Sequence, residues 1–155
     1  MSALVAAGVF AGEGEARVGA VSDHQGTMRS AADTSGLEPG LARAFTMAES
    51  AAQAQGVALQ ITSGYRTPAQ QQALWDDGVA TYGADVHRWV LPPEKSAHVA
   101  GGAIDVGPLQ GAQWLEANGS RWGLCRIFAN EYWHFELRTA PGALCPPLLP
   151  DASSL

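Results

Sequence analysis

Apolar residues recur at helical spacing in residues 39–55. The positions that share one helix face are Leu41, Ala44, Phe45, Ala48, Ala51 and Ala52. Proline suits the first turn of a helix, and glycine suits the position just past its end. We therefore expect a helix that begins at Pro39 and stops before Gly56. Residues 1–33 show no convincing period, and we treat them as an N-terminal extension.

A strand and a second helix follow. Residues 57–62 alternate and predict a strand, with its apolar face formed by Val57, Leu59 and Ile61. After a turn at residues 63–66, Thr67 suits the N-cap of a helix, Pro68 its first position and Gln70 the reciprocal capping position. We expect this helix to run to about Asp77 and to end at Gly78.

The remaining elements are shorter. Residues 78–102 predict a long loop, and ordered loops of this length are usually functional. We expect a strand at 103–107, a helix at 110–118, and strands at 123–128 and 132–138 joined by a tight turn at 129–131. The mixed order and the closeness of the last two strands favour an α+β fold, in which helices pack on a small, mainly antiparallel sheet.

Alternation along two of these strands presents polar side chains opposite the core. In residues 103–107, Ile104 and Val106 share one face, and Asp105 lies on the other between residues too small to cover it. In the last strand, His134 and Glu136 share the face opposite the apolar one. The pattern therefore exposes a carboxylate and an imidazole on strands of the same sheet.

Composition narrows the class of protein. A chain of 155 residues has the size of one domain, and 46% hydrophobic against 15% charged residues excludes wholesale disorder. No apolar run approaches the ~18–20 residues that a membrane span requires, so we expect no transmembrane segment. The formal net charge of −6 disfavours binding to polyphosphate, and we expect no nucleic-acid partner.

Two features bear on the cellular compartment and leave alternatives open. Residues 4–11 are apolar but short for a signal peptide and follow no positive charge, so either a signal has been removed or this stretch packs on the domain. Cys125 and Cys145 fit no metal-ligand spacing. A bond between them would be worth ~3 kcal/mol in the chain-entropy model and would imply an oxidising compartment. Two separate buried thiols are the alternative.

Candidate chemistry gathers around two histidines. His98 and His134 both lie in polar surroundings, although either one alone would more often be a structural histidine. Two histidines and Asp105 make a three-ligand catalytic zinc set with a fourth position for water. A separate glutamate is the usual general base beside such a water. Glu131 lies three positions before His134, in the turn that precedes the last predicted strand. The H-E-x-x-H helix motif is absent, so a zinc peptidase here must have another architecture.

The spacing of these residues resembles a known family. The motif Ser96-x-His98-x-x-Gly101-x-Ala103-x-Asp105, followed by Glu131-x-Trp133-His134, resembles the VanY-like D-alanyl-D-alanine carboxypeptidases. These are zinc enzymes of the bacterial wall, in the wider group that contains lysostaphin-type and hedgehog-type domains. The turn at residues 63–67 is also similar, and the resemblance covers about residues 37–139. It implies a zinc carboxypeptidase domain, which we place at 34–145, with a C-terminal tail at 146–155.

The resemblance implies a role for each matching residue. One Zn²⁺ per chain would be held by His98, Asp105 and His134, and Glu131 would be the catalytic base. Arg66 would engage the carbonyl and carboxylate region of the substrate, and Gln71 and Ser96 would be polar substrate contacts. Alternatives remain for the last three. We expect Arg66 to lie on a turn without a buried partner, or else to pair with an acidic residue of the following helix; Gln71 could face solvent, and Ser96 could cap its turn.

The implied function is the removal of the terminal D-alanine of peptidoglycan stem peptides by a monomeric, secreted or cell-envelope enzyme. An endopeptidase or an L,D-carboxypeptidase on the same scaffold is an alternative, and a zinc-binding or wall-binding module without turnover belongs to another class. The stretch between Asp105 and Glu131 is short for the family, which predicts fewer walls around the cleft. In an exported protein we expect the Cys125–Cys145 bond, which would tie the tail back across the sheet.

Overall fold

The computed structural model describes residues 21–22, 28–29 and 33–155. A short antiparallel pair, β1 (Val21–Ser22) and β2 (Met28–Arg29), precedes the main body. The apolar stretch at residues 4–11 lies outside the described residues, so neither reading of it is tested. The domain boundaries stay a prediction as well.

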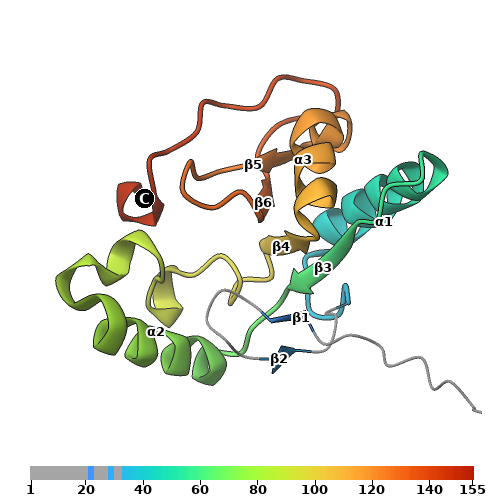
Figure 1. Cartoon of the computed structure of the whole chain (residues 1–155). Helices are drawn as coiled ribbons and strands as arrows, with labels where there is room; N and C mark the ends of the chain where they lie inside the picture. The colour runs from blue at the N-terminus through green and yellow to red at the C-terminus, as the bar shows by residue number, and fades with distance from the viewer. Residues whose placement is uncertain (1–20, 23–27, 30–32) are drawn as a thin grey trace, which may run out of the picture.

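An antiparallel sheet of four strands lies at the centre of the fold (Figure 1). Its strands are β3 (Gln60–Ser63), β4 (Ala103–Gly107), β5 (Leu124–Arg126) and β6 (His134–Leu137), in the order β3-β4-β6-β5. This arrangement confirms the predicted α+β class. In the register of β4 and β6, Asp105 lies directly opposite His134, so two of the predicted ligands are cross-strand neighbours.

Helices α1 (Pro39–Ala54) and α3 (Leu109–Asn118) pack against the sheet and close the main core (Figure 1). The fully buried side chains of this core include Leu41 of α1, Leu115 of α3, and Ile104 and Phe135 of the sheet. The apolar face predicted for residues 39–55 is the face that α1 buries. Burial of such side chains, at ~25 cal/mol per Å² of apolar surface, holds the helices on the sheet.

Helix α2 (Pro68–Tyr82) begins as predicted and ends later. The Thr67 hydroxyl accepts a hydrogen bond from the Gln70 backbone N–H, and the Gln70 side chain accepts one from the Thr67 N–H, which confirms the capping box. The predicted end at Gly78 is wrong. A Cβ at Gly78 would lie 2.9 Å from Cγ2 of Val86, so the glycine permits close packing inside the helix, which continues to Tyr82.

The segment predicted as a long loop contains more regular secondary structure than expected. It contains the 3₁₀ helices η1 (Gly83–Arg88) and η2 (Pro93–Lys95). Val86 and Val90 pack with Leu74 of α2 into a second apolar cluster, which holds the segment against the helix. Two isolated valines carry no period, so local pattern alone could not show that this segment is buried.

The chain folds back over the sheet after β6. Cys125 and Cys145 form a disulfide, which confirms that prediction. Leu149 forms a parallel bridge with Phe128, and the C-terminal 3₁₀ helix η4 (Ala152–Ser154) lies beside η1 (Figure 1). The residues of the predicted tail therefore pack on the rest of the domain.

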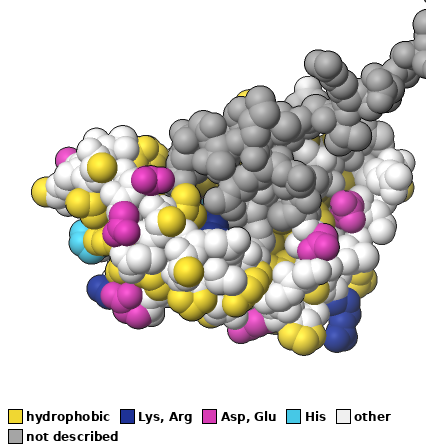
Figure 2. Space-filling view, turned by 90° about the horizontal axis from the view of Figure 1, so that it is seen from below, with side chains coloured by type: hydrophobic (Ala, Val, Ile, Leu, Met, Phe, Trp, Pro, Cys, Tyr) yellow, Lys and Arg dark blue, Asp and Glu magenta, His cyan; other side chains and the backbone are white. Residues whose placement is uncertain are grey.

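Acidic side chains are scattered over the face drawn in Figure 2, and basic side chains do not gather into one patch there. This distribution agrees with the formal net charge of −6. In the part of the chain that the structure describes, none of the helices is both long and apolar enough to cross a membrane.

Candidate active site

Three buried side chains converge between the sheet and the segment before β4. They are His98, Asp105 and His134, and one ligand atom of each lies within 4.8 Å of the others. Asp105 Oδ1 lies 3.4 Å from His98 Nε2 and 3.2 Å from His134 Nδ1. Two imidazole nitrogens and a carboxylate oxygen are the donor set of catalytic zinc sites, so this group could hold such a metal ion.

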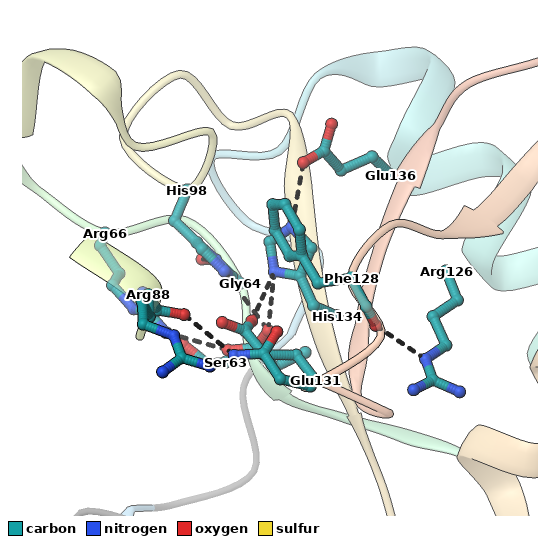
Figure 3. A network of polar contacts seen from close by, with 12 residues as sticks. Ser63, Gly64, Arg66, Arg88, His98, Arg126, Phe128, Glu131, His134 and Glu136 are labelled. Carbon is teal, nitrogen blue, oxygen red and sulfur yellow. Dashed lines mark hydrogen bonds and ion pairs between the residues drawn. The ribbon is translucent and has the colours of Figure 1, made fainter. Parts of the chain in front are cut away.

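The His98 ring is oriented by a backbone carbonyl. Its Nδ1 lies 2.8 Å from the Gly64 oxygen and donates to it, which leaves the Nε2 lone pair facing Asp105 (Figure 3). Burial lowers the pKa of His98, so the ring is held in the neutral form that binds metals. The loop that carries His98 needs a glycine at Gly101. This residue has φ +72°, and a Cβ there would lie 2.5 Å from the Gly36 oxygen.

The His134 ring is oriented by a carboxylate. Its Nε2 lies 2.9 Å from Glu136 Oε1, and its Nδ1 faces Asp105 (Figure 3). Burial opposes protonation of His134, but the hydrogen bonds to Asp105 and Glu136 outweigh it and raise the pKa of this histidine to about 9. A carboxylate behind a histidine is the usual support of a metal ligand. Glu136 has no predicted role from the sequence, although alternation places it on the same strand face as His134.

Glu131 lies beside the three-residue group. It is buried in the connection between β5 and β6, with Oε2 3.8 Å from His134 Nδ1. Burial raises the pKa of Glu131 to about 7, with His134 acting in the opposite direction. The connection is held by Arg126, which donates from Nε to the Phe128 oxygen (3.0 Å) and from Nη2 to the Ala129 oxygen (2.6 Å). The arrangement provides a proton acceptor next to a possible metal ion.

The expectation that Arg66 has no buried partner is wrong, and the partner that it finds on α2 is an amide, Gln71. Arg66 donates from Nη2 to Asp105 Oδ2 at 2.9 Å, from Nη1 to Gln71 Oε1 at 3.2 Å, and from Nε to the Ser63 hydroxyl at 3.0 Å. Burial would raise the pKa of Asp105, but His98, His134 and Arg66 hold it well below its usual range. Sequence could not reveal the pairing with Asp105 because this residue lies 39 positions from Arg66.

Gln71 and Ser96 are both buried next to this group. Only 2% of Gln71 is exposed, and its amide donates to the Leu91 oxygen at 2.8 Å, so the solvent-facing alternative is wrong. Ser96 follows η2 directly, and its backbone N–H donates to the Pro93 oxygen.

A single cavity joins the side chains of the predicted site. Each of the seven predicted residues lines it: Arg66, Gln71, Ser96, His98, Asp105, Glu131 and His134. Apolar and aromatic side chains, among them Trp89, Phe128 and Trp133, form much of the remaining wall. Convergent polar groups on an apolar wall are typical of a site for a small molecule or a peptide end.

Comparison with known proteins identifies the family. The family model of the D-alanyl-D-alanine carboxypeptidase VanY matches residues 34–139. The chain belongs to the VanY family. A D-alanyl-D-alanine carboxypeptidase of Enterococcus faecalis is 31% identical in an alignment that covers 55% of this chain and 42% of that protein. The chain thus spans less than half the length of this VanY-type relative.

Solved structures of the VanY type have the same fold. A mutant of the vancomycin resistance D,D-pentapeptidase VanY in complex with Zn(II) is 26% identical, with a TM-score of 0.60 over 69% of this chain and 77% of that chain. VanYB in complex with D-alanine-D-alanine is 26% identical, with a TM-score of 0.61 over 69% and 76%. The LD-carboxypeptidase LdcB, at 22% identity, TM-score 0.57 and coverage of 64% and 58%, shares the fold. The resemblance inferred from the sequence motifs is confirmed.

Proposed function

We propose that this protein is a zinc-dependent D,D-carboxypeptidase, which hydrolyses the terminal D-alanine of peptidoglycan stem peptides. One observation carries the proposal: the ligand atoms of His98, Asp105 and His134 lie within 4.8 Å of one another in a cavity that also contains the Glu131 carboxylate. Family membership supports it, as do the Zn(II) and D-alanine-D-alanine complexes of the two similar proteins.

His98, Asp105 and His134 would hold one zinc ion per chain. Bound zinc supplies Lewis-acid chemistry, because it polarises a carbonyl group and lowers the pKa of a water molecule. The donor set fits this ion. The Gly64 carbonyl fixes the tautomer of His98, and Glu136 supports His134 from behind, so a nitrogen of each ring is directed at Asp105.

The other residues would bind the peptide and move protons. Glu131 accepts a proton from the attacking water and delivers it to the nitrogen of the leaving D-alanine as the C–N bond breaks. In the metal-free protein burial raises the pKa of Glu131 to about 7, which favours proton acceptance by this carboxylate. Arg66 binds the substrate carboxylate or the oxyanion that develops on the scissile carbonyl. Gln71 holds Arg66 in place, and Ser96 hydrogen-bonds the substrate terminus.

The substrate and the disulfide together suggest where the protein works. Peptidoglycan lies outside the cytoplasmic membrane, and a Cys125–Cys145 bond persists in oxidising compartments. We therefore propose a secreted or cell-envelope enzyme. We propose that it acts as a monomer, since the residues assigned to catalysis all come from one chain.

Digestion of defined stem peptides tests the function. Zinc-loaded protein is incubated with a pentapeptide stem that ends in D-alanyl-D-alanine, with a tetrapeptide stem and with cross-linked muropeptides, and the products are identified by mass spectrometry. We expect the loss of a single D-alanine from the pentapeptide, and none of this product with His134→Ala. Shortening of the tetrapeptide alone would indicate an L,D-carboxypeptidase, cleaved cross-links an endopeptidase, and binding without any product a module without turnover.

A further inference from the structure

The residues after Cys145 lie beyond the part of the chain that the family model matches, yet they reach the active-site cavity. The matched region ends at residue 139. Ala152 and Leu155 line the same cavity as His98 and Glu131. We infer that residues 149–155 form a wall of the active site that limits the size of the terminal residue of the substrate. The inference rests on the proposed function and deepens it.

Several independent contacts hold this segment in place. The Leu149 N–H donates to the Ile127 oxygen at 2.9 Å, and the Leu149 oxygen accepts from the Ala129 N–H at 2.8 Å. Both contacts lie on the connection that carries Glu131. Upstream, the Cys125–Cys145 bond attaches the chain to β5. The wall therefore begins from a fixed point next to the proposed catalytic base.

The far end of the segment is fixed by an ion pair. Arg88 Nε lies 2.9 Å from Asp151 Oδ2, and the other carboxylate oxygen accepts from the Ser153 N–H at 3.0 Å at the start of η4. Ala152 is 4% exposed and packs with Ile127 and Phe128. The backbone oxygen of Arg88 also accepts a hydrogen bond from Asn130, the neighbour of Glu131. These contacts join η1, the connection before β6 and the C-terminal segment.

The segment contributes to two hollows of the surface. Ala152 and Leu155 line both the active-site cavity and a second hollow that also contains Arg88 and Lys95. Figure 1 shows the C-terminal turn (red) beside the segment that follows α2. The segment therefore shapes the active-site cavity and the second hollow together.

The two side chains of the wall that line the active-site cavity, Ala152 and Leu155, are apolar. Val90 and Leu91 line the same cavity, so this lining suits a small apolar group such as the methyl of alanine. In such a pocket, two substrates that differ by one methylene group differ in kcat/KM by ~10–200-fold. Leu155 is 60% exposed, so it can be changed without disturbing the core.

Point variants of the full chain test the wall. The variants are Leu155→Ala, Leu155→Trp and Asp151→Ala, and Leu148→Ala is the matched control. Leu148 is 41% exposed, lies in the same part of the chain and does not line the cavity. The substrates are acylated peptides that end in D-alanine or in D-leucine, and the readout is the ratio of kcat/KM for D-leucine to that for D-alanine.

We expect Leu155→Ala to raise this ratio about 10-fold. Asp151→Ala, which removes the ion pair with Arg88 and the hydrogen bond from the Ser153 N–H, should also raise it, and Leu155→Trp should lower it. Leu148→Ala should leave the ratio and the melting temperature unchanged. The inference is overturned if Leu155→Ala and Asp151→Ala turn over the D-alanine peptide normally with an unchanged ratio. A change in kcat/KM that appears only when the penultimate residue of the peptide is enlarged would equally overturn the inference that the wall contacts the terminal residue.

Binding to metal-free protein keeps the inference separate from the proposed function. Trp89 and Trp133 line the cavity, so their fluorescence reports peptide binding without turnover. If the wild-type protein hydrolyses neither peptide, the proposed function fails. In that case a parallel change in the ratio of the two Kd values in Leu155→Ala supports the wall, and an unchanged ratio overturns it.

Discussion

Replacing Glu136 by alanine tests how the protein holds His134 for the metal. Glu136 Oε1 accepts a hydrogen bond from His134 Nε2 at 2.9 Å, and only 8% of this residue is exposed. Loss of the partner behind a ligating histidine typically weakens metal binding about 10–100-fold, or ~1.4–2.7 kcal/mol. We expect Glu136→Ala to weaken zinc binding by this factor. His134→Ala should have a much larger effect, because it removes one of three protein ligands.

Competition from protons makes the size of this effect depend on pH. Zinc must displace a proton from His134, whose pKa is about 9 in the metal-free protein. The bond to Glu136 is one cause of this raised pKa, so Glu136→Ala lowers it and reduces the competition at neutral pH. The gain partly offsets the lost orientation of the ring. We therefore expect Glu136→Ala to lose less zinc affinity at about pH 7 than at about pH 9.5. At the higher pH His134 is largely deprotonated in both the wild type and the variant.

The assay is competition for zinc with a chromophoric chelator at both pH values. Arg138→Ala is the matched control, because it removes the partner of Glu136 on the solvent side, where Arg138 Nε lies 3.5 Å from Glu136 Oε2. The control should keep its zinc affinity within about twofold, because the arginine of this 3.5 Å ion pair is exposed to solvent, where such contacts are weak. Glu136→Gln retains an acceptor near His134 and should lose less than alanine. Folded Glu136→Ala protein that binds zinc as tightly as wild type at the higher pH would refute the role of Glu136.

Three further predictions follow from the same site. Glu131→Gln should retain zinc and lose turnover about 10²–10⁴-fold, whereas exposed Glu94→Gln should change neither; loss of zinc would make Glu131 a ligand. Arg66→Lys should lower kcat about 10²–10³-fold and also reduce the stability by ~1–3 kcal/mol, because Gln71 loses a buried donor; destabilised protein with normal kcat would make Arg66 purely structural. In the metal-free protein the raised pKa of His134 contributes stability that is complete below pH 6.5 and is lost as the pH rises through about 9. The melting temperature should fall over that interval more steeply than with zinc bound, and a flat metal-free curve would contradict the assignment.

Local pattern predicted the elements that carry the site. Alternation put Asp105 on one strand and His134 on another, each opposite its core face, and the capping residues located the start of α2. These features are encoded by neighbours a few positions apart, so they can be read from the chain. The pairing of β4 with β6 then places Asp105 directly opposite His134.

Contacts between distant segments could not be predicted in this way. A glycine such as Gly78 is typical of the end of a helix. Only its packing against Val86 shows why the helix continues through it. The ion pair between Arg88 and Asp151 joins residues separated by 63 positions. Nothing in the local sequence of either residue indicates the other. The sequence therefore predicts only a C-terminal tail at residues 146–155, although two of these residues line the active-site cavity.

The carboxylate of Asp105 links the two halves of the site. Its Oδ1 faces His98 Nε2 and His134 Nδ1, and its Oδ2 accepts from Arg66 Nη2. The metal-binding group and the substrate-binding arginine therefore share one side chain. The sequence predicts a substrate-binding role for Arg66 but no buried partner, because the pairing with Asp105 joins residues 39 positions apart. Because Asp105 is fixed by the register of β4 and β6, Arg66 gains a defined position from the same sheet that sets the metal ligands.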